Sequence, residues 1–301
     1  SWADEDHGGR YGFGWMAENH PDKLAAPYAV NEGGGVPISA AGNLTYLLGI
    51  GEKGRLQLEI EVRGSSAHAS TPWQGSNALF GLSEVVKRIE AYEAERDTST
   101  SLFDHLSTFA IEDKPSPENI DHINADHEEN QPRFTSIMKA LSRMTITPTM
   151  INGGIKSNSV PESVRLTCDV RTLPHQDEAY VRQELGKILE GIDGVEIDVD
   201  YMSIPNASEF DTEFASRIQI STARALGRDD IQWVPSLSTG FTDSRFTRNL
   251  GTTTYGMVGS HPDDDPMLSF IHGTNESVGI RSLVSGTRIM LALAYDVLAA
   301  N

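Results

Sequence analysis

The most regular pattern of apolar and polar residues begins at Arg55, after which every second residue from 56 to 62 is apolar. A period of two predicts a β-strand with one buried face. Strands of the same kind are predicted at 144–151, 163–171 and 195–201. These four segments account for most of the regular alternation along the chain.

Two segments between these strands carry apolar residues at helical spacing instead. In residues 77–93 the apolar positions recur every three or four residues, and Ser76 or Asn77 suits the N-cap. A second helix is predicted from the same spacing, with Val181, Leu185, Ile188, Leu189 and Ile192 on its apolar face. The resulting order, βαββαβ, is that of the ferredoxin-like split motif.

The flanks of this motif predict a second domain. Residues 1–53 and 204–301 both mix short apolar strands with helical segments, which indicates one α/β domain interrupted by an α+β domain at 54–203. A polar segment at about 94–139, rich in Asp, Glu, Ser and Pro, is interpreted as an insertion within the α+β domain. A chain of 301 residues is long enough for two domains with real cores.

Charge and cysteine content then narrow the function. The 24 Lys and Arg residues against 43 Asp and Glu residues give a net charge of −19, which disfavours a nucleic-acid partner. The single cysteine, Cys168, excludes an intramolecular disulfide and is expected to be a buried apolar thiol. The longest apolar stretch, near 289–300, is interrupted by Asp296 and predicts an amphipathic terminal helix, so no membrane partner is expected.

Three motifs carry groups that can bind metal. Glu5 and Asp6 belong to a run of three carboxylates before a glycine pair, where a divalent cation would relieve their repulsion; acids at a helix N-terminus are the plainer interpretation. Glu32 follows an apolar run and precedes three glycines, a pattern that suits either a ligand site at a strand end or a simple turn. His272 precedes the terminal helix and is either a ligand or a cap.

Three further motifs lie in loops. His68 stands in a loop of small residues after the first strand of the α+β domain. Asn158 lies in the segment 153–162, and Arg171 ends the strand that follows it, where its planar fork suits a carboxylate or a solvent-exposed strand end. The segment 239–245 contains a glycine and a threonine, Gly240 and Thr242.

In this order along essentially the whole chain, the six motifs make the sequence similar to a superfamily of zinc-dependent amidohydrolases and exopeptidases. The superfamily includes aminoacylase, glutamate carboxypeptidase, acetylornithine deacetylase and succinyl-diaminopimelate desuccinylase. The resemblance implies a three-layer αβα catalytic domain of the phosphorylase/hydrolase-like type, N-terminally truncated here. The inserted ferredoxin-like α+β domain then corresponds to the family's lid and dimerisation domain.

The resemblance also implies a role for each motif. The family site holds two zinc ions, with cobalt or manganese as possible substitutes, and hydrolyses an N-acyl amino acid or small peptide bearing a free carboxylate. The homodimer that the family forms uses the lid domain. The implied roles are general base for Glu5, metal ligand for Asp6, Glu32 and His272, a catalytic lid residue for His68, and substrate contacts for Asn158, Arg171, Gly240 and Thr242.

The resemblance is incomplete at the start of the chain. The family has two more ligands, a His in a His-x-Asp motif and a bridging Asp, before the position of Glu5, but only four residues precede Glu5 here. His261 and Asp263 repeat the His-x-Asp spacing in the wrong part of the chain and are interpreted as a coincidence. We therefore expect a fragment with weak metal binding and little activity. The alternative is a non-catalytic, dimeric ligand-binding relative; a cytoplasmic location is expected because no targeting segment is recognisable.

Overall fold

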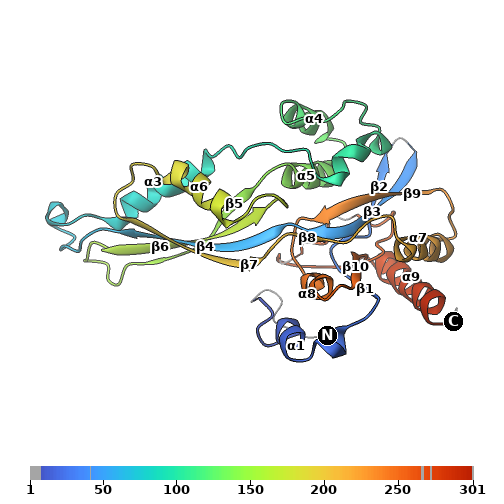
Figure 1. Ribbon diagram of the computed structural model, residues 1–301. Coiled ribbons are helices and arrows are strands. Elements are labelled where there is room, and N and C mark those ends of the chain that lie inside the picture. The colour runs from blue at the N-terminus through green and yellow to red at the C-terminus, as the bar shows by residue number, and fades with distance from the viewer. Residues whose placement is uncertain (1–7, 41, 266–267, 272, 300–301) are drawn as a thin grey trace. The chain divides into compact units, whose positions relative to one another are not determined.

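The computed structural model describes residues 8–40, 42–265, 268–271 and 273–299, and the chain divides into two compact units (Figure 1). Unit 1 comprises Ser1–Lys53, Arg96–Ser142 and Asn206–Asn301, and unit 2 comprises Gly54–Glu95 and Arg143–Pro205. The sequence assigned the polar segment 94–139 to the same domain as 54–93. The structure differs here, because Arg96–Ser142 packs within unit 1.

Unit 2 is built on a four-stranded antiparallel sheet with the strand order β5-β6-β4-β7. Two helices, α3 and α6, connect its strands, so the chain order is β4-α3-β5-β6-α6-β7. This arrangement confirms the ferredoxin-like βαββαβ motif predicted from the periodicity. The bounds are β4 Gly54–Arg63, α3 Ala78–Glu90, β5 Thr145–Gly153, β6 Ser163–Thr172, α6 Glu178–Leu189 and β7 Val195–Ser203.

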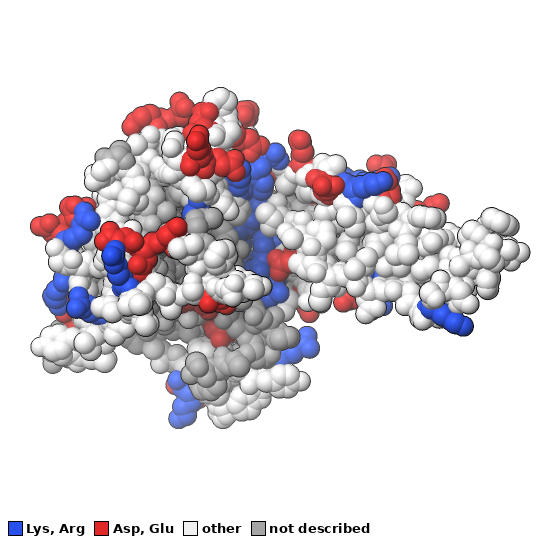
Figure 2. Space-filling view, turned by 180° about the vertical axis from the view of Figure 1, so that it is seen from behind, with Lys and Arg blue, Asp and Glu red and all other residues white. Residues whose placement is uncertain are grey.

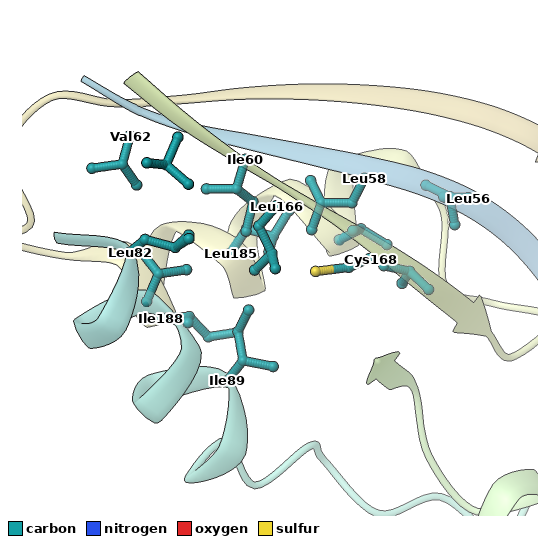
Figure 3. Packing of buried hydrophobic residues seen from close by; sticks show 14 of the residues in the cluster. Leu56, Leu58, Ile60, Val62, Leu82, Ile89, Leu166, Cys168, Leu185 and Ile188 are labelled. Atoms are coloured by element: carbon teal, nitrogen blue, oxygen red, sulfur yellow. The ribbon is translucent and has the colours of Figure 1, made fainter. Parts of the chain in front are cut away.

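The apolar face of this sheet packs on α3 and α6 (Figure 3). Leu56, Leu58 and Ile60 of β4 are fully buried, as is Cys168 of β6, whose predicted burial is thereby confirmed. Asn77, not Ser76, caps α3, because its side-chain oxygen accepts from the backbone N–H of Leu79 at 3.0 Å. The opposite sheet face carries the polar residues of the same strands.

Unit 1 contains a mixed six-stranded sheet centred on β3 (Figure 1). β3 pairs in parallel with β9 and antiparallel with β2, β8 and β10, and β10 pairs in parallel with β1. The bounds are β1 Tyr28–Asn31, β2 Val36–Ala40, β3 Asn43–Glu52, β8 Asn206–Ala207, β9 Ile231–Ser238 and β10 Thr253–Gly256.

Helices cover both faces of this sheet, which gives the predicted three layers. Tyr46 and Leu48 of β3 face α7 (Glu213–Leu226) and α9 (Ile280–Leu298), and the intervening Leu47 faces the opposite side. Short helices α1 (Phe13–Asn19), α2 (Pro21–Leu24) and α8 (Ser244–Asn249) also belong to this unit. The fold class expected from the sequence is confirmed.

The second face is covered by the polar segment Arg96–Ser142, which we expected as an insertion within the α+β domain. It folds into the 3₁₀ segment η3 (Ser101–Phe109) and the helices α4 (Ile120–His127) and α5 (Pro132–Leu141). Its few apolar side chains, among them Phe109 and Phe134, are buried against β2, β3 and β9. Lys53, buried at the end of β3, donates from Nζ to the carbonyl of Ala140 at 2.6 Å, where a cation complements the carboxyl end of α5.

The surface agrees with the acidic composition. Acidic side chains gather over α4 and the turn that follows it, where Asp121, Asp126, Glu128 and Glu129 are exposed (Figure 2). Such a surface disfavours a phosphate backbone as a partner. Within the described residues, no helix combines the length and apolarity needed to cross a bilayer.

Candidate functional site

Glu32 lies directly after β1, in a turn that is pressed onto the sheet by glycines. A Cβ on Gly34 would come within 2.2 Å of the carbonyl oxygen of Gly256, and a Cβ on Gly256 would come within 2.6 Å of the carbonyl oxygen of Glu32. Gly49 of β3 is equally close, since a Cβ there would lie 2.4 Å from the oxygen of Gly33. Only glycine permits this backbone approach, so the turn holds an exposed carboxylate on a fixed main chain.

The side chain before Glu32 ties the turn to a second loop. Asn31 donates from Nδ2 to Oγ of Ser244 at 3.2 Å and to Oγ1 of Thr242 at 3.4 Å. Gly33 lies beside Ser238, whose Oγ accepts from the backbone N–H of Gly240 at 3.2 Å. The predicted substrate-loop residues Gly240 and Thr242 are therefore brought next to the predicted metal ligand Glu32.

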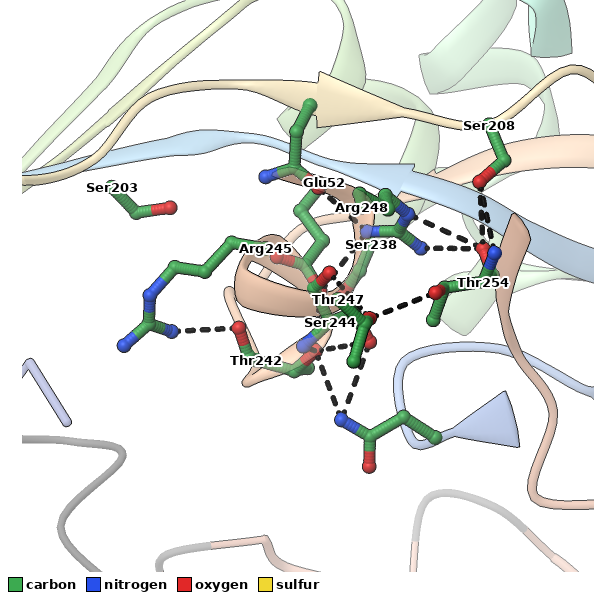
Figure 4. A network of polar contacts seen from close by, with 12 residues as sticks. Glu52, Ser203, Ser208, Ser238, Thr242, Ser244, Arg245, Thr247, Arg248 and Thr254 are labelled. Carbon is green, nitrogen blue, oxygen red and sulfur yellow. Dashed lines mark hydrogen bonds and ion pairs between the residues drawn. The ribbon is translucent and has the colours of Figure 1, made fainter. Parts of the chain in front are cut away.

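Beneath this loop is a buried network of polar side chains (Figure 4). The Thr242 hydroxyl donates to Oε1 of Glu52, and that oxygen lies 3.5 Å from Nη1 of Arg248. The side chains of Glu52 and Arg248 are only 2% and 5% exposed. Burial lowers the pKa of Arg248, while the Glu52 carboxylate acts in the opposite direction.

Arg248 has further partners that fix its position. Its Nη1 donates to Oδ1 of Asn206 at 2.7 Å, and its Nε and Nη2 donate to the carbonyl of Thr254 at 3.2 and 3.1 Å. The side chain thus joins α8 to β8 and β10. Each of the three guanidinium nitrogens reaches an acceptor on the adjacent strands, as a buried guanidinium requires.

Helix α8 also contacts the start of the described chain. The ring of Phe246 lies so close to Gly9 and Gly14 that a Cβ on either glycine would come within 3.0 Å of it. The Arg245 guanidinium stacks between the rings of Phe241 and Phe246, at 4.4 Å from each centroid. One short helix therefore contacts both the Glu32 turn and the glycines that follow the acidic motif.

Of the three predicted metal ligands, Glu32 is the one within the residues that the structure describes. Glu5, Asp6 and His272 lie outside the described residues. Across the described ranges, no group of three or more His, Cys, Asp or Glu side chains is arranged to hold a metal ion. His261 and Asp263, with their ring nitrogen and carboxylate 3.9 Å apart, stand near the start of α9, and Asp263 lies 3.3 Å from Arg281.

In unit 2 the structure brings two predicted site residues together. The backbone N–H of Ala69 donates to the carbonyl of Asn158 at 3.0 Å, and His68 forms a β-bridge with Ser159. The imidazole of His68 is exposed, and its Nδ1 lies 2.7 Å from Oγ of Ser70. His68 and Asn158 thus belong to one loop pair at the end of β4.

The guanidinium of Arg171 is already engaged by a carboxylate of its own strand. Its Nε and Nη2 donate to the two carboxylate oxygens of Asp169 at 2.5 and 3.1 Å, and Arg55 donates to the same carboxylate at 3.0 Å. Asp169 is not among the predicted site residues, although its position two residues before Arg171 places both on the polar face of β6. A substrate carboxylate at Arg171 would share the guanidinium with Asp169.

Comparisons with known proteins agree with this architecture. A family model described as a peptidase dimerisation domain matches residues 50–194. A probable succinyl-diaminopimelate desuccinylase of Staphylococcus aureus (strain MRSA252) is 24% identical over 181 residues, which cover 60% of this chain and 41% of that protein. Human N-fatty-acyl-amino acid synthase/hydrolase PM20D1 is 24% identical over 260 residues, which cover 83% of this chain and 50% of that protein.

Among solved structures, an M20 family metallo-carboxypeptidase, Sso-CP2 from Sulfolobus solfataricus, has the same fold. It superposes with a TM-score of 0.63 at 19% identity, covering 98% of this chain and 69% of that one. The chain spans half or less of the length of the two curated relatives. These matches confirm the resemblance to the M20 metallo-exopeptidase superfamily that was drawn from the sequence motifs.

Proposed function

We propose that this chain supplies the Glu32 side of a metal centre, together with the lid, in a zinc-dependent hydrolase. The hydrolase cleaves the amide bond of an N-acyl amino acid or small peptide that bears a free carboxylate. The observation that carries the proposal is the Glu32 turn, where close-packed glycines and the Asn31 amide hold an exposed carboxylate at a strand end. A fixed backbone beneath a solvent-facing carboxylate is what a preorganised ligand needs.

The residues present fit a divalent metal in part. A carboxylate such as that of Glu32 is a good ligand for one zinc, cobalt or manganese ion, and Asp6 and His272 would share the other ion. A bound metal of this type would activate a water and polarise the scissile carbonyl. Two metal ions per site, the number that the resemblance implies, are part of this proposal.

The remaining roles are assigned to this chain's own side chains. Glu5 would take the proton of the attacking water and pass one to the leaving amine. His68 would donate a hydrogen bond to the developing oxyanion. Asn158 and Arg171, with Gly240 and Thr242 lining the site, would orient the substrate and its carboxylate.

A homodimer through unit 2 belongs to the same proposal. It is supported by the match to a peptidase dimerisation domain and by Phe80, an aromatic side chain of α3 that is 77% exposed. An exposed aromatic side chain on a helix can pack against its own copy across a two-fold axis. Phe80→Ser should shift the sedimentation velocity of the chain from dimer to monomer, and an unchanged profile would contradict this interface.

The test of the metal site is zinc stoichiometry and affinity by titration calorimetry on metal-stripped protein. We expect Glu32→Gln to weaken zinc binding by roughly tenfold or more, because a neutral amide is a poor ligand in place of a carboxylate. Glu18→Gln, an exposed change on α1 of the same unit, is the matched control and should leave the affinity unchanged. Equal affinities for the Glu32→Gln chain and the wild type would refute the proposed ligand.

A further inference from the structure

We propose that Glu52 and Arg248 are positioning residues for Glu32, acting through the hydroxyls of Thr242 and Ser244. The inference rests on the proposed metal-binding role of Glu32, and it concerns residues that neither the motifs nor the comparisons single out. It follows from one continuous set of buried contacts in unit 1 (Figure 4).

The first step of the relay is the charge pair. Oε1 of Glu52 accepts a hydrogen bond from the Thr242 hydroxyl and lies 3.5 Å from Nη1 of Arg248. The carboxylate therefore fixes the direction in which that hydroxyl proton points. Oε2 of Glu52 is buried and has no hydrogen-bond partner among the described residues. A buried carboxylate with one unpaired oxygen is costly, and the adjacent cation offsets part of that cost.

The second step is the hydroxyl pair. Oγ1 of Thr242 lies 2.8 Å from Oγ of Ser244 and accepts from the backbone N–H of Ser244 at 3.0 Å. Because Thr242 donates its only proton to Glu52, its oxygen can only accept from Ser244, and the Asn31 amide is shared between Oγ of Ser244 at 3.2 Å and Oγ1 of Thr242 at 3.4 Å. The direction of the whole network is therefore set by the charge on Glu52.

The third step reaches the turn. The amide of Asn31 contacts both hydroxyls, and Asn31 is joined to Glu32 by a single peptide bond. The close backbone contacts of Gly34 and Gly256 hold the turn against the sheet. Glycines have no side chain, however, that would resist movement of the turn parallel to the sheet surface. The hydrogen bonds of the Asn31 amide supply that restraint. The buried pair of Glu52 and Arg248 fixes the orientation of the hydroxyls that accept these bonds.

The experiment compares Thr242→Val with Thr242→Ser, since valine keeps the shape and loses the hydroxyl whereas serine retains it. Thr222→Val is the matched control: Thr222 is also fully buried in unit 1, but its hydroxyl donates within α7 to the carbonyl of Ile218. The first measurement is amide hydrogen exchange of the segment 28–36 in metal-free protein. We expect faster exchange there in Thr242→Val and Glu52→Gln, and wild-type exchange in Thr242→Ser and Thr222→Val.

The second measurement is zinc affinity of the same variants. Residues that orient a ligand typically contribute roughly 10- to 100-fold in metal affinity, and we expect a loss of that size in Thr242→Val with recovery in Thr242→Ser. Exchange at 28–36 that responds no more to Thr242→Val than to Thr222→Val would overturn the relay. A wild-type chain that binds no zinc while exchange responds as expected would instead refute the proposed function and leave the positioning of the turn established.

Discussion

The backbone N–H of Ser70 donates to Nδ1 of His68, with 3.2 Å between the two nitrogen atoms. A backbone amide can only donate, so Nδ1 must accept, and the neutral imidazole carries its proton on Nε2. The hydroxyl of Ser70, 2.7 Å from the same nitrogen, reinforces this arrangement. The exposed side of His68 is then a hydrogen-bond donor, which is the form required by its proposed role at an oxyanion.

We predict that the chemical shifts of the ring nitrogens, measured at a pH at which the imidazole is neutral, will show His68 as the Nε2–H tautomer. His122 is an internal control, because its Nδ1 lies 2.9 Å from a carboxylate oxygen of Asp126 and must be the protonated nitrogen. Ser70→Ala should leave the His68 tautomer unchanged, since the backbone donor remains. A proton on Nδ1 of His68 in the wild type would exclude the donor role in this loop conformation.

Gly34→Ala should destabilise unit 1. The added Cβ meets backbone atoms of Gly256 and Gly49, which cannot move away as a flexible side chain could. We expect a loss of about 1–3 kcal/mol or more in the free energy of unfolding, measured by urea denaturation. The loss should be accompanied by weaker zinc binding if Glu32 is a ligand.

The control for this change is Gly186→Ala. Gly186 is exposed on α6, and a Cβ there meets nothing within 4 Å. Alanine in a helix interior is favoured over glycine by roughly 0.5–1 kcal/mol, so this variant should gain stability. A Gly34→Ala chain as stable as the wild type would show that the turn is not packed as described.

Much of unit 2 could be predicted because its elements are long and regular. The alternation around Leu58 and the helical spacing around Leu82 each continue for several periods, so local sequence and tertiary packing agree. In the segment 96–142 the apolar residues are few and fall in helices of one to three turns. Each periodic run of apolar residues is too short to be recognised among the polar residues around it. These apolar positions become apparent only through their burial against the sheet.

The site shows the same division. The glycines beside Glu32 could be recognised because a strand followed by Glu and three glycines is a local pattern. The contact between Glu52 and Thr242 joins residues 190 positions apart, and neither stands in a pattern that predicts the other. Charged residues such as Glu52 at a strand end and Arg248 in a short helix are most often exposed, so their burial here depends on tertiary structure alone.

We predict that the contacts of Asp296, which join α9 to α7, are lost in acid. Its carboxylate accepts from Arg224 at 2.7 Å and from the Ser221 hydroxyl at 2.9 Å, and these bonds, Arg224 first, lower its pKa. Because the folded pKa lies below the unfolded value of about 3.9, the link stabilises fully above that pH and is lost as the pH falls through the folded pKa.

The measurement is the melting temperature of the wild type and of Asp296→Asn as a function of pH. The wild type should melt higher between pH 5 and 7, and the difference should shrink once the pH falls below about 4. Asp229→Asn, at an exposed position before β9, should show no such pH-dependent difference. A difference that stays constant down to pH 2 would mean that the carboxylate charge does not stabilise this helix pair.

Cys168 should be inert toward thiol reagents in the folded chain. Its side chain is fully buried among apolar residues of β4, β6 and α6, and burial raises the pKa of its thiol to about 12. Both the thiolate form and access to the reagent are therefore suppressed at pH 8. Since the chain has one cysteine, the labelling signal has a single source. We expect one thiol per chain to react promptly in denaturant and only at the slow rate of unit 2 opening in its absence, with urea accelerating the reaction before the main unfolding transition. Equal rates in native and denatured samples would contradict the packing of this core.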